Sequence, residues 1–178
     1  MSEHTDSASG ANRRSEILAV ARKIVREEGA AALTQPRLAR YMALRQSHIT
    51  YYFPRKADLY AALLTESHER MGARAEQAVG DCCEALVRIT FDAESMRFYL
   101  SMLLASASSP DLRAALRAHA QAIEAELAEW LGRRPGDRSV SAFVDELRGL
   151  GLRALVEPDL AMPDVRVMAR RHGLELPR

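Results

Sequence analysis

A run of hydrogen-bonding side chains occupies residues 45–52 of this 178-residue chain. It brings a guanidinium, an amide, an imidazole and two hydroxyls close together, on Arg45, Gln46, His48, Ser47 and Thr50. Groups of this length and polarity reach base edges in the major groove of DNA. The phenol hydroxyls of the next two residues, Tyr51 and Tyr52, can reach phosphate oxygens. The chemistry that these residue types favour is contact with nucleic acid.

The elements around this run are those that would position it. Thr34 is a suitable N-cap for a short helix over 35–41, which has a proline in its first turn. A turn over 42–44 leads to a second helix over 45–52, which Pro54 ends. Two apolar residues four positions apart should hold this second helix against a core, Ile49 and Phe53. The pattern predicts a helix-turn-helix over about 33–52.

The stretch from Leu33 to Leu59 resembles the DNA-binding domain of the tetracycline-repressor (TetR) family of transcriptional regulators. The positions that match the family's pattern are Thr34, Leu38, Ala39, Leu44, Ile49, Tyr51, Phe53, Lys56 and Leu59. The resemblance covers roughly residues 13–64. Further along the chain, only the helix order and the sequence Arg148-Gly149-Leu150 are similar to the family.

The chain departs from the family's pattern at four positions of this stretch, two of which are His48 and Thr50, where the family often has threonine and tyrosine. Ala43 stands where the family has a turn glycine, so an adjusted or mildly strained turn is expected. Arg45 stands where the family usually has a serine, which removes a helix cap and adds a group that can contact phosphate or guanine. These changes affect which operator is recognised rather than the binding mode.

The resemblance and the residue types together give a predicted set of DNA-contacting residues. The set is Thr34, Gln35, Arg37, Arg45, Gln46, Ser47, His48, Thr50, Tyr51, Tyr52 and Lys56. The resemblance also implies a homodimer whose two recognition helices enter successive major grooves of a palindromic double-stranded operator. Charge is consistent with this: residues 1–60 hold ten Lys and Arg against six Asp and Glu, whereas the whole chain has a net charge of +1.

Composition and periodicity predict an all-α protein. Good helix formers dominate the sequence, and no segment alternates with period two for long. The expected helices cover about 13–28, 35–41, 45–52, 55–79, 81–90, 93–106, 110–131, 138–156 and 163–172. The predicted organisation is a disordered tail over 1–12, a three-helix DNA-binding domain over 13–56 and a C-terminal helical effector-binding and dimerisation domain over 57–178.

The resemblance implies a repressor that a small hydrophobic or aromatic effector releases from DNA by shifting the dimer between two spacings. Candidate pocket residues lie on the apolar stripes of the later helices: Met71, Phe91, Met96, Tyr99, Met102, His119, Ile123, Trp130 and Phe143. Residues on such stripes also form ordinary core. Candidate dimer-interface residues are Val140, Val144, Leu147, Gly151, Leu155, Val165 and Met168, and Gly149 and Gly151 are expected to allow close packing.

Other function classes have weaker support. The adjacent Cys82 and Cys83 leave open a redox-responsive regulator, although inert packing is the commoner role of such cysteines. A helical dimeric adaptor or an enzyme without DNA binding remains an alternative, but the sequence contains no nucleophile motif or phosphate-binding glycine loop. The histidines are not spaced as a zinc site, and no cofactor or catalytic residue is predicted. Without a membrane-length apolar run or a signal-peptide core, the chain is expected to be cytoplasmic.

Overall fold

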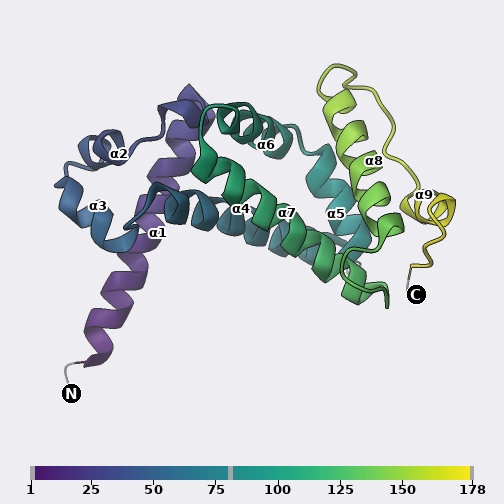
Figure 1. Ribbon diagram of the computed structural model, residues 1–178, viewed down its shortest axis with the longest axis horizontal. Coiled ribbons are helices and arrows are strands. Elements are labelled where there is room, and N and C mark those ends of the chain that lie inside the picture. Colours follow the sequence, from purple (N-terminus) through teal and green to yellow (C-terminus); the bar gives the residue numbers. More distant parts are fainter. Residues whose placement is uncertain (1–2, 80–81, 177–178) are drawn as a thin grey trace. The chain divides into compact units, whose positions relative to one another are not determined.

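The computed structural model describes residues 3–79 and 82–176, and over this part of the chain it contains helices and turns but no strand. The helices are α1 (Glu3–Glu28), η1 (Ala30–Ala32), α2 (Gln35–Tyr41), α3 (Gln46–Tyr52), α4 (Lys56–Val79), α5 (Cys82–Phe91), α6 (Ala93–Ser106), α7 (Pro110–Trp130), α8 (Arg138–Ala154) and α9 (Val165–Arg171) (Figure 1). The predicted all-α class is confirmed.

Most helix boundaries lie within a few residues of those expected, and α2 and α6 have the predicted limits. The start of α1 differs. The helix is continuous from Glu3, so most of the stretch predicted to be a disordered tail is helical. Asn12, which was expected to cap a helix beginning at residue 13, lies inside α1, where its amide donates to the Glu16 carboxylate at 3.2 Å. An asparagine can bond within a helix surface in this way, so its presence did not mark a helix end.

The chain divides into two compact units. The first contains the described residues up to Thr65 together with Leu100–Leu116. Its core brings together apolar residues from α1, the α1–α2 connection, α2, α3 and α4, namely Ile17, Ala21, Ile24, Leu33, Leu38, Ile49, Phe53, Leu59 and Leu63. The unit that holds the helix-turn-helix thus also includes the second half of α6 and the start of α7.

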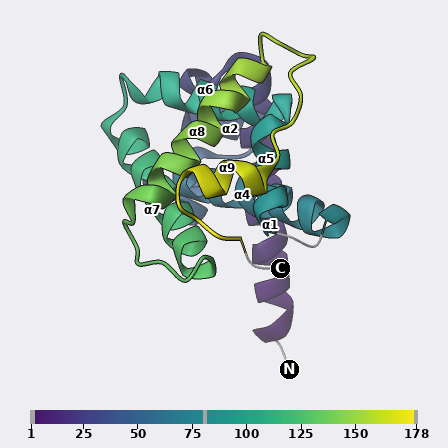
Figure 2. The same cartoon turned by 90° about the vertical axis from the view of Figure 1, so that its right-hand side faces the viewer.

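The second unit contains Glu66–Tyr99 and the described residues from Arg117 onward. Its hydrophobic core consists of Val87, Leu127, Ala128, Val140, Phe143, Val144, Leu147, Val165, Met168, Ala169 and Leu174. Both of its last helices begin at an aspartate cap: Asp137 accepts from the Ser139 amide at 2.8 Å, and Asp164 accepts from the Arg166 amide at 2.9 Å. These caps satisfy amides that a helix start leaves unpaired. Figure 2 shows α5, α8 and α9 of this unit together.

The two glycines of α8 differ in their surroundings. A Cβ added to Gly151 would lie 2.5 Å from the Thr90 carbonyl oxygen and 2.6 Å from Met96 Cε. Close packing is therefore confirmed at Gly151, where α8 meets the end of α5 and the start of α6. A Cβ on Gly149 would meet nothing within 4 Å, so the described residues show no close packing there, and the prediction for Gly149 stays a prediction.

None of the helices that the structure describes has the length and apolar character needed to cross a bilayer.

Candidate nucleic-acid interface

The first half of the helix-turn-helix is built as its sequence indicates. The Thr34 hydroxyl accepts from the Arg37 amide at 3.3 Å and caps α2, with Pro36 in the first turn. The turn after α2 passes through Ala43, which has φ of 53° and is the non-glycine residue with positive φ in the described chain. Its neighbours close the turn with a Leu44 N–H to Ala39 C=O bond of 2.9 Å. Alanine thus adopts the backbone conformation that glycine would hold without strain, as expected for this substitution.

The orientation of α3 is fixed by its apolar side. Ile49 and Phe53 are completely or almost completely buried, which confirms that they face the core. The opposite side of the helix carries the exposed residues Gln46, Ser47 and His48, with Arg45 exposed at the N-cap. The structure gives these four side chains no hydrogen-bonding or ionic partner among the described residues. A short helix with one anchored face and one unpaired polar face is suited to entering a DNA groove.

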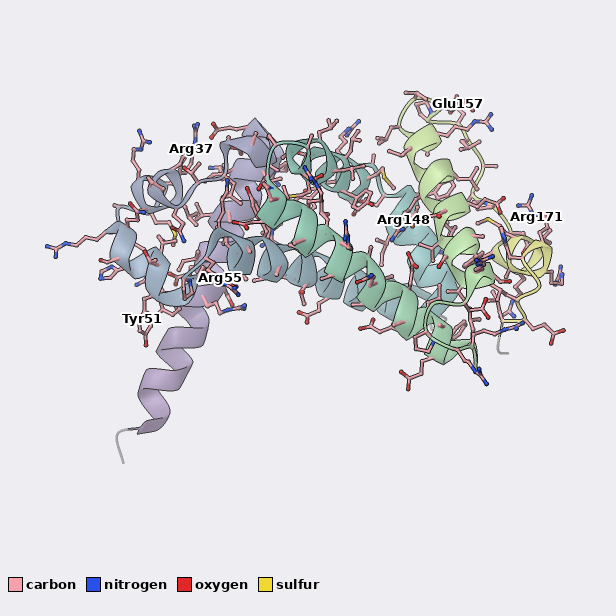
Figure 3. All side chains as sticks on the ribbon, viewed as in Figure 1. Arg37, Tyr51, Arg55, Arg148, Glu157 and Arg171 are labelled. Atoms are coloured by element: carbon pink, nitrogen blue, oxygen red, sulfur yellow. The ribbon has the colours of Figure 1, made fainter. Side chains whose placement is uncertain are left out.

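The other α3 candidates differ in whether their side chains are accessible for contact with DNA. Tyr51 is 79% exposed and points outward from the helix (Figure 3). Its ring meets that of Tyr52 edge-on, with centroids 5.0 Å apart, and Tyr52 is half-buried. The Thr50 hydroxyl donates to the Gln46 carbonyl oxygen at 2.7 Å, within its own helix. Tyr51 therefore has the access that a phosphate contact needs, whereas the Thr50 hydroxyl proton is already used.

Three of the candidates on α2 have partners inside the first unit. The Gln35 amide nitrogen donates to the Phe53 carbonyl oxygen at 2.8 Å and joins the start of α2 to the end of α3. The Arg37 guanidinium pairs with Glu28 at the end of α1, and Glu28 also accepts from the Tyr41 hydroxyl at 3.1 Å. Together with the Thr34 cap, these contacts hold α2 in place. Their predicted contact with DNA stays a prediction, and their shown role is positional.

The start of α4 contributes cations beside α3. Lys56 Nζ lies 5.2 Å from the ring centroid of the buried Tyr60, a cation–π arrangement. Arg55, which sequence analysis did not select, is exposed and donates to Asp58, with Nη2 2.6 Å from Oδ1. This hydrogen bond holds the pKa of Asp58 below its ordinary value and raises the pKa of Arg55. The exposed Arg40 was also missed. Its position one turn before Ala43 was the available signal.

The candidate effector residues do not form one described site. Phe143 is fully buried in the second unit's core, with its ring 6.1 Å from that of His172. Met96 is buried against Gly151 in the same unit, whereas Met102 is buried in the first unit. Five others are half-buried, namely Phe91, Tyr99, His119, Ile123 and Trp130. Three candidate side chains, those of Met71, Cys82 and Cys83, lie outside the described part of the structure.

The dimer-interface prediction requires correction. Six of its residues, Val140, Val144, Leu147, Gly151, Val165 and Met168, are buried inside the protomer, and Leu155 is half-buried. The six buried residues cannot also face a partner. Helical periodicity identified the apolar stripe of α8 and α9 but could not say whether the stripe packs within the chain or between two chains.

Polar contacts join α8 to α7 and to the end of α9. Glu124 of α7 accepts from Ser141 at 2.9 Å and pairs with Arg148 at 3.4 Å. Glu146 lies 2.7 Å from Arg171 of α9 and 2.5 Å from His172 Nε2, measured between the nitrogen and oxygen atoms (Arg148 and Arg171 are labelled in Figure 3). Exposed apolar side chains are Leu152 of α8, at 37%, and Val156 just after the helix, at 78%.

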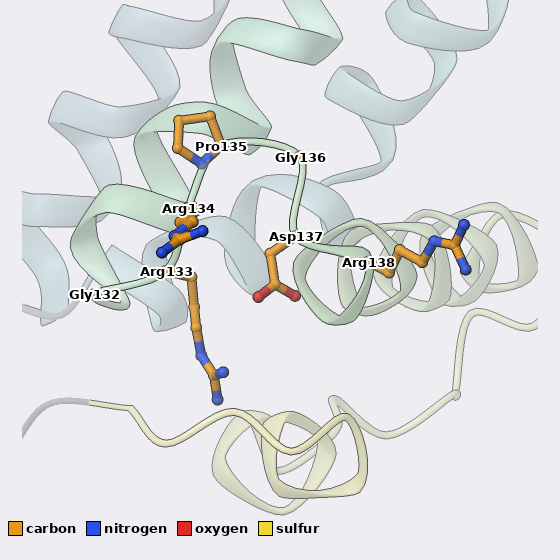
Figure 4. Close-up of a pocket in the computed structure, with 7 residues that line it drawn as sticks. All are labelled: Gly132, Arg133, Arg134, Pro135, Gly136, Asp137 and Arg138. Carbon is orange, nitrogen blue, oxygen red and sulfur yellow. The ribbon is translucent and has the colours of Figure 1, made fainter.

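A hollow of about 580 Å³ opens at the α7–α8 turn, lined by residues 132–138 (Figure 4). The Arg133 guanidinium donates to the Gly173 carbonyl oxygen at 2.7 Å. The side chains of Arg134 and Arg138 point in other directions, so the three guanidinium groups do not converge on a common point. The hollow contains none of the candidate effector residues, and its arginines are not arranged to hold one small anion.

Comparisons with known proteins agree with this geometry. The model of the bacterial regulatory proteins of the tetR family matches residues 17–63, and that of the tetracyclin repressor-like C-terminal domain matches residues 73–172. The nucleoid occlusion factor SlmA of Aliivibrio fischeri is 32% identical over 117 residues, which are 65% of this chain. The chain spans only 56% of the length of that relative.

Solved structures share the fold. The multidrug binding protein EbrR, complexed with imidazole, has a TM-score of 0.63 and 24% identity, covering 93% of this chain and 97% of its own. A regulator from Rhodococcus sp. assigned to the TetR family has a TM-score of 0.65 and 18% identity, covering 92% of this chain and 96% of its own. Another structure of EbrR contains ethidium.

Proposed function

The chain belongs to the TetR family of DNA-binding transcriptional regulators, and from this premise we propose that it is a homodimeric repressor released from a palindromic operator by a small molecule. The observation that carries the DNA-binding part of the proposal is the unpaired polar face of α3, which Ile49 and Phe53 hold outward from a rigid core. The two family matches favour a regulator over a helical adaptor or an enzyme.

The side-chain types of α3 and of the start of α4 indicate which residues would contact bases and which would contact phosphates. Arg45 and Gln46 stand at the start of the helix, and their planar groups can form bidentate hydrogen bonds to guanine and adenine, respectively. Tyr51 and Lys56 supply a hydroxyl and a point charge for phosphates. Two such helices in a two-fold dimer would occupy half-sites one turn of DNA apart. The operator should therefore be palindromic.

Exposed apolar residues on α8 and after it support a revised dimer surface. Large apolar residues exposed in the second unit are Leu152, Val156, Met162 and Val167, with Val156 the most exposed at 78%. Gly149, on α8 together with Leu152, has open space above its Cα. Apolar side chains that are exposed in one protomer gain most when a second copy covers them, and a glycine lets two helices approach closely.

The effector part of the proposal is supported by aromatic side chains of the second unit. Phe91 and Trp130 are partly buried and pack against its core, and Tyr99 is half-buried. Such rings suit a planar, apolar or cationic molecule. The relative EbrR has been crystallised with ethidium and proflavin, which are planar aromatic molecules. We therefore place the effector among small aromatic compounds.

Selection from a pool of random duplexes tests the DNA-binding part. The unaltered protein should enrich a palindrome, and its affinity should fall steeply with salt, with a log–log slope of about −0.9 for each phosphate contacted. Arg45→Ala should lose discrimination at defined base pairs, whereas Tyr51→Ala should weaken binding to every duplex. Arg134→Ala, which removes an exposed charge from the α7–α8 turn of the second unit, is the matched control. Failure to enrich any sequence would refute a specific regulator.

Ethidium can test the effector part in the absence of DNA, because the chain has a single tryptophan, Trp130. Binding near this residue should quench its fluorescence saturably, and Trp130→Phe should abolish the signal while calorimetry still detects the ligand. If calorimetry detects no binding of ethidium or proflavin, the proposed ligand class is wrong.

A further inference from the structure

The Ser101 side chain of α6 joins the connection between α1 and α2. The Ala30 amide donates to Ser101 Oγ at 2.9 Å across 71 residues of sequence, and both residues belong to the first unit. Ala30 is 1% exposed, so water cannot readily replace this acceptor. The preceding Gly29 has φ of 85°, and a Cβ there would lie 3.7 Å from Ser101 Oγ. The hydroxyl therefore contacts the backbone directly at this bend.

This contact takes the place of a side-chain helix cap. Gly29 is the N-cap of η1 and has no side chain that could accept from the first amides of the turn. Ser101 supplies the acceptor from a different helix instead. From η1 the chain continues through the fully buried Leu33 to Thr34, the cap of α2. The position of α2, and with it the turn into α3, therefore depends on a hydroxyl that α6 carries.

The other end of α6 is held by α8. Met96 is buried, and its Cε occupies space that a Cβ on Gly151 would enter at 2.6 Å. Met96 belongs to the second unit and Ser101 to the first, and both are on the same uninterrupted helix. Five residues of helix separate them by only about 7.5 Å along the axis. A change in the packing of α8 against Met96 would therefore act on the same helix that carries Ser101.

The geometry points to Ser101 as a positioning residue for DNA binding. Its hydroxyl group, which we call the latch, is the contact through which α6 fixes the position of η1 and α2. Met96, on the same helix, is the residue of α6 that packs against α8. This inference rests on the proposed function, because it assigns the latch to the DNA-competent arrangement of the first unit. Ser101 itself contacts no DNA in this scheme.

Ser101→Ala tests the latch directly. At a temperature well below unfolding, its affinity for a duplex selected by the unaltered protein should fall about tenfold, which is the factor expected when a buried donor loses its acceptor. The Ala30 amide should exchange its hydrogen faster, while amides in α8 and α9 exchange as before. Ser101→Thr keeps the hydroxyl and should restore both readouts. Ser108→Ala is the matched control, since that exposed hydroxyl contacts only the Ala105 carbonyl oxygen, at 3.3 Å.

The outcomes separate the latch from the proposed function. If folded Ser101→Ala binds DNA as well as the unaltered protein, the positioning role is overturned, even if the variant unfolds at a lower temperature. If the unaltered protein enriches no duplex, the proposed function fails first, and that failure is seen without any variant.

The contribution of Met96 is tested by a double-mutant cycle. Met96→Ala should also speed exchange at the Ala30 amide, and adding it to Ser101→Ala should produce little further change, because the two residues act through one contact. Leu174→Ala is the control, since it shortens a buried side chain in the core cluster of the second unit, which does not include Met96. Independent, multiplying effects of Met96→Ala and Ser101→Ala would refute the link through α6.

Discussion

Helix α3 of the first unit and the region of α8 in the second expose side chains of opposite kinds. In the first unit, Gln46, Ser47 and His48 of α3 are exposed and their side chains have no partner among the described residues, while Ile49 of the same helix is buried. In the second, Glu124 and Glu146 hold α8 to its neighbours, and large apolar groups such as Val156 are exposed. An unpaired polar face suits a hydrated, charged partner such as DNA, whereas an exposed apolar face suits a second protein surface.

The largest effect that tests this contrast is expected for Phe143→Ala. Because Phe143 is fully buried in the second unit's core, its truncation should lower the free energy of unfolding by about 3–5 kcal/mol. Denaturant unfolding followed by circular dichroism gives this value. A loss below ~1 kcal/mol would mean that Phe143 lines a ligand cavity rather than the core. Trp130→Phe, a milder change at the edge of the same cluster, serves as the comparison.

Val156→Asp tests the exposed apolar face. The side chain is 78% exposed in the protomer, so the folded monomer should tolerate the change within about 0.5 kcal/mol. If a second copy covers this residue, a carboxylate there should weaken dimerisation by about 2–4 kcal/mol. Analytical ultracentrifugation over a range of concentrations measures it, with Val140→Ala, a buried change on α8 of the same unit, as a control for stability. A dimer unaffected by Val156→Asp would place the interface elsewhere.

The contrast also explains what the sequence could predict. The exposed polar run of α3 could be found because buried Ile49 and Phe53 fix, by spacing alone, which side of a short helix faces out. In the second unit the stripe containing Val144, Leu147 and Met168 was identified correctly as apolar, but it was assigned to a dimer surface and lies in the core. Periodicity gives the direction in which a helix buries its side chains, not the chain against which it does so.

Contacts between distant residues were beyond prediction for a different reason. No local sequence pattern predicts that Ser101 accepts from the Ala30 amide, or that Glu146 pairs with Arg171 and His172. The absence of a side-chain cap at Gly29 implies that an acceptor comes from elsewhere, but η1 was not among the expected helices. Apart from the start of α1, most helix limits were predictable to within a few residues because caps, prolines and glycines act locally.

Arg45→Ala examines the polar face of the first unit. If Arg45 makes a bidentate contact to a base pair, its removal should weaken binding to the preferred duplex by about 1–3 kcal/mol and relax preference at that position. The exposed side chain caps no helix, so the unfolding midpoint should stay unchanged. Fluorescence anisotropy with matched and mismatched duplexes gives both numbers. Equal loss on all duplexes would assign Arg45 to phosphate instead.

Ala43→Gly is expected to have a smaller effect, and a favourable one. Ala43 adopts φ of 53° in the turn between α2 and α3, which an L side chain adopts at a cost. Glycine removes that strain but gains entropy in the unfolded chain, so a net stabilisation of about 0.5 kcal/mol is expected. Thermal unfolding measures it, with Ala57→Gly near the start of α4, where no positive φ is required, as a control that should destabilise. Loss of stability in Ala43→Gly would show that the turn is unstrained.

The smallest expected effects concern one exposed ion pair in each region. Asp58 accepts from the Arg55 side chain and from the Arg55 amide, at 3.0 Å, and these bonds lower its pKa below the ordinary 3.8. Among the described residues, Glu157 accepts from the Arg153 side chain, at 2.9 Å, and this bond lowers its pKa below the ordinary 4.5.

A carboxyl group with a depressed folded pKa contributes stability above its unfolded pKa and loses it as the pH falls through the folded value. Stability from Asp58 should therefore be complete at neutral pH and decline below about pH 4. Asp58→Asn should flatten the pH dependence of unfolding in that range more than Glu157→Gln does, because Asp58 also satisfies a backbone amide at the start of α4 and Glu157 satisfies none. A larger change for Glu157→Gln would mean that backbone capping adds nothing to the Arg55–Asp58 pair.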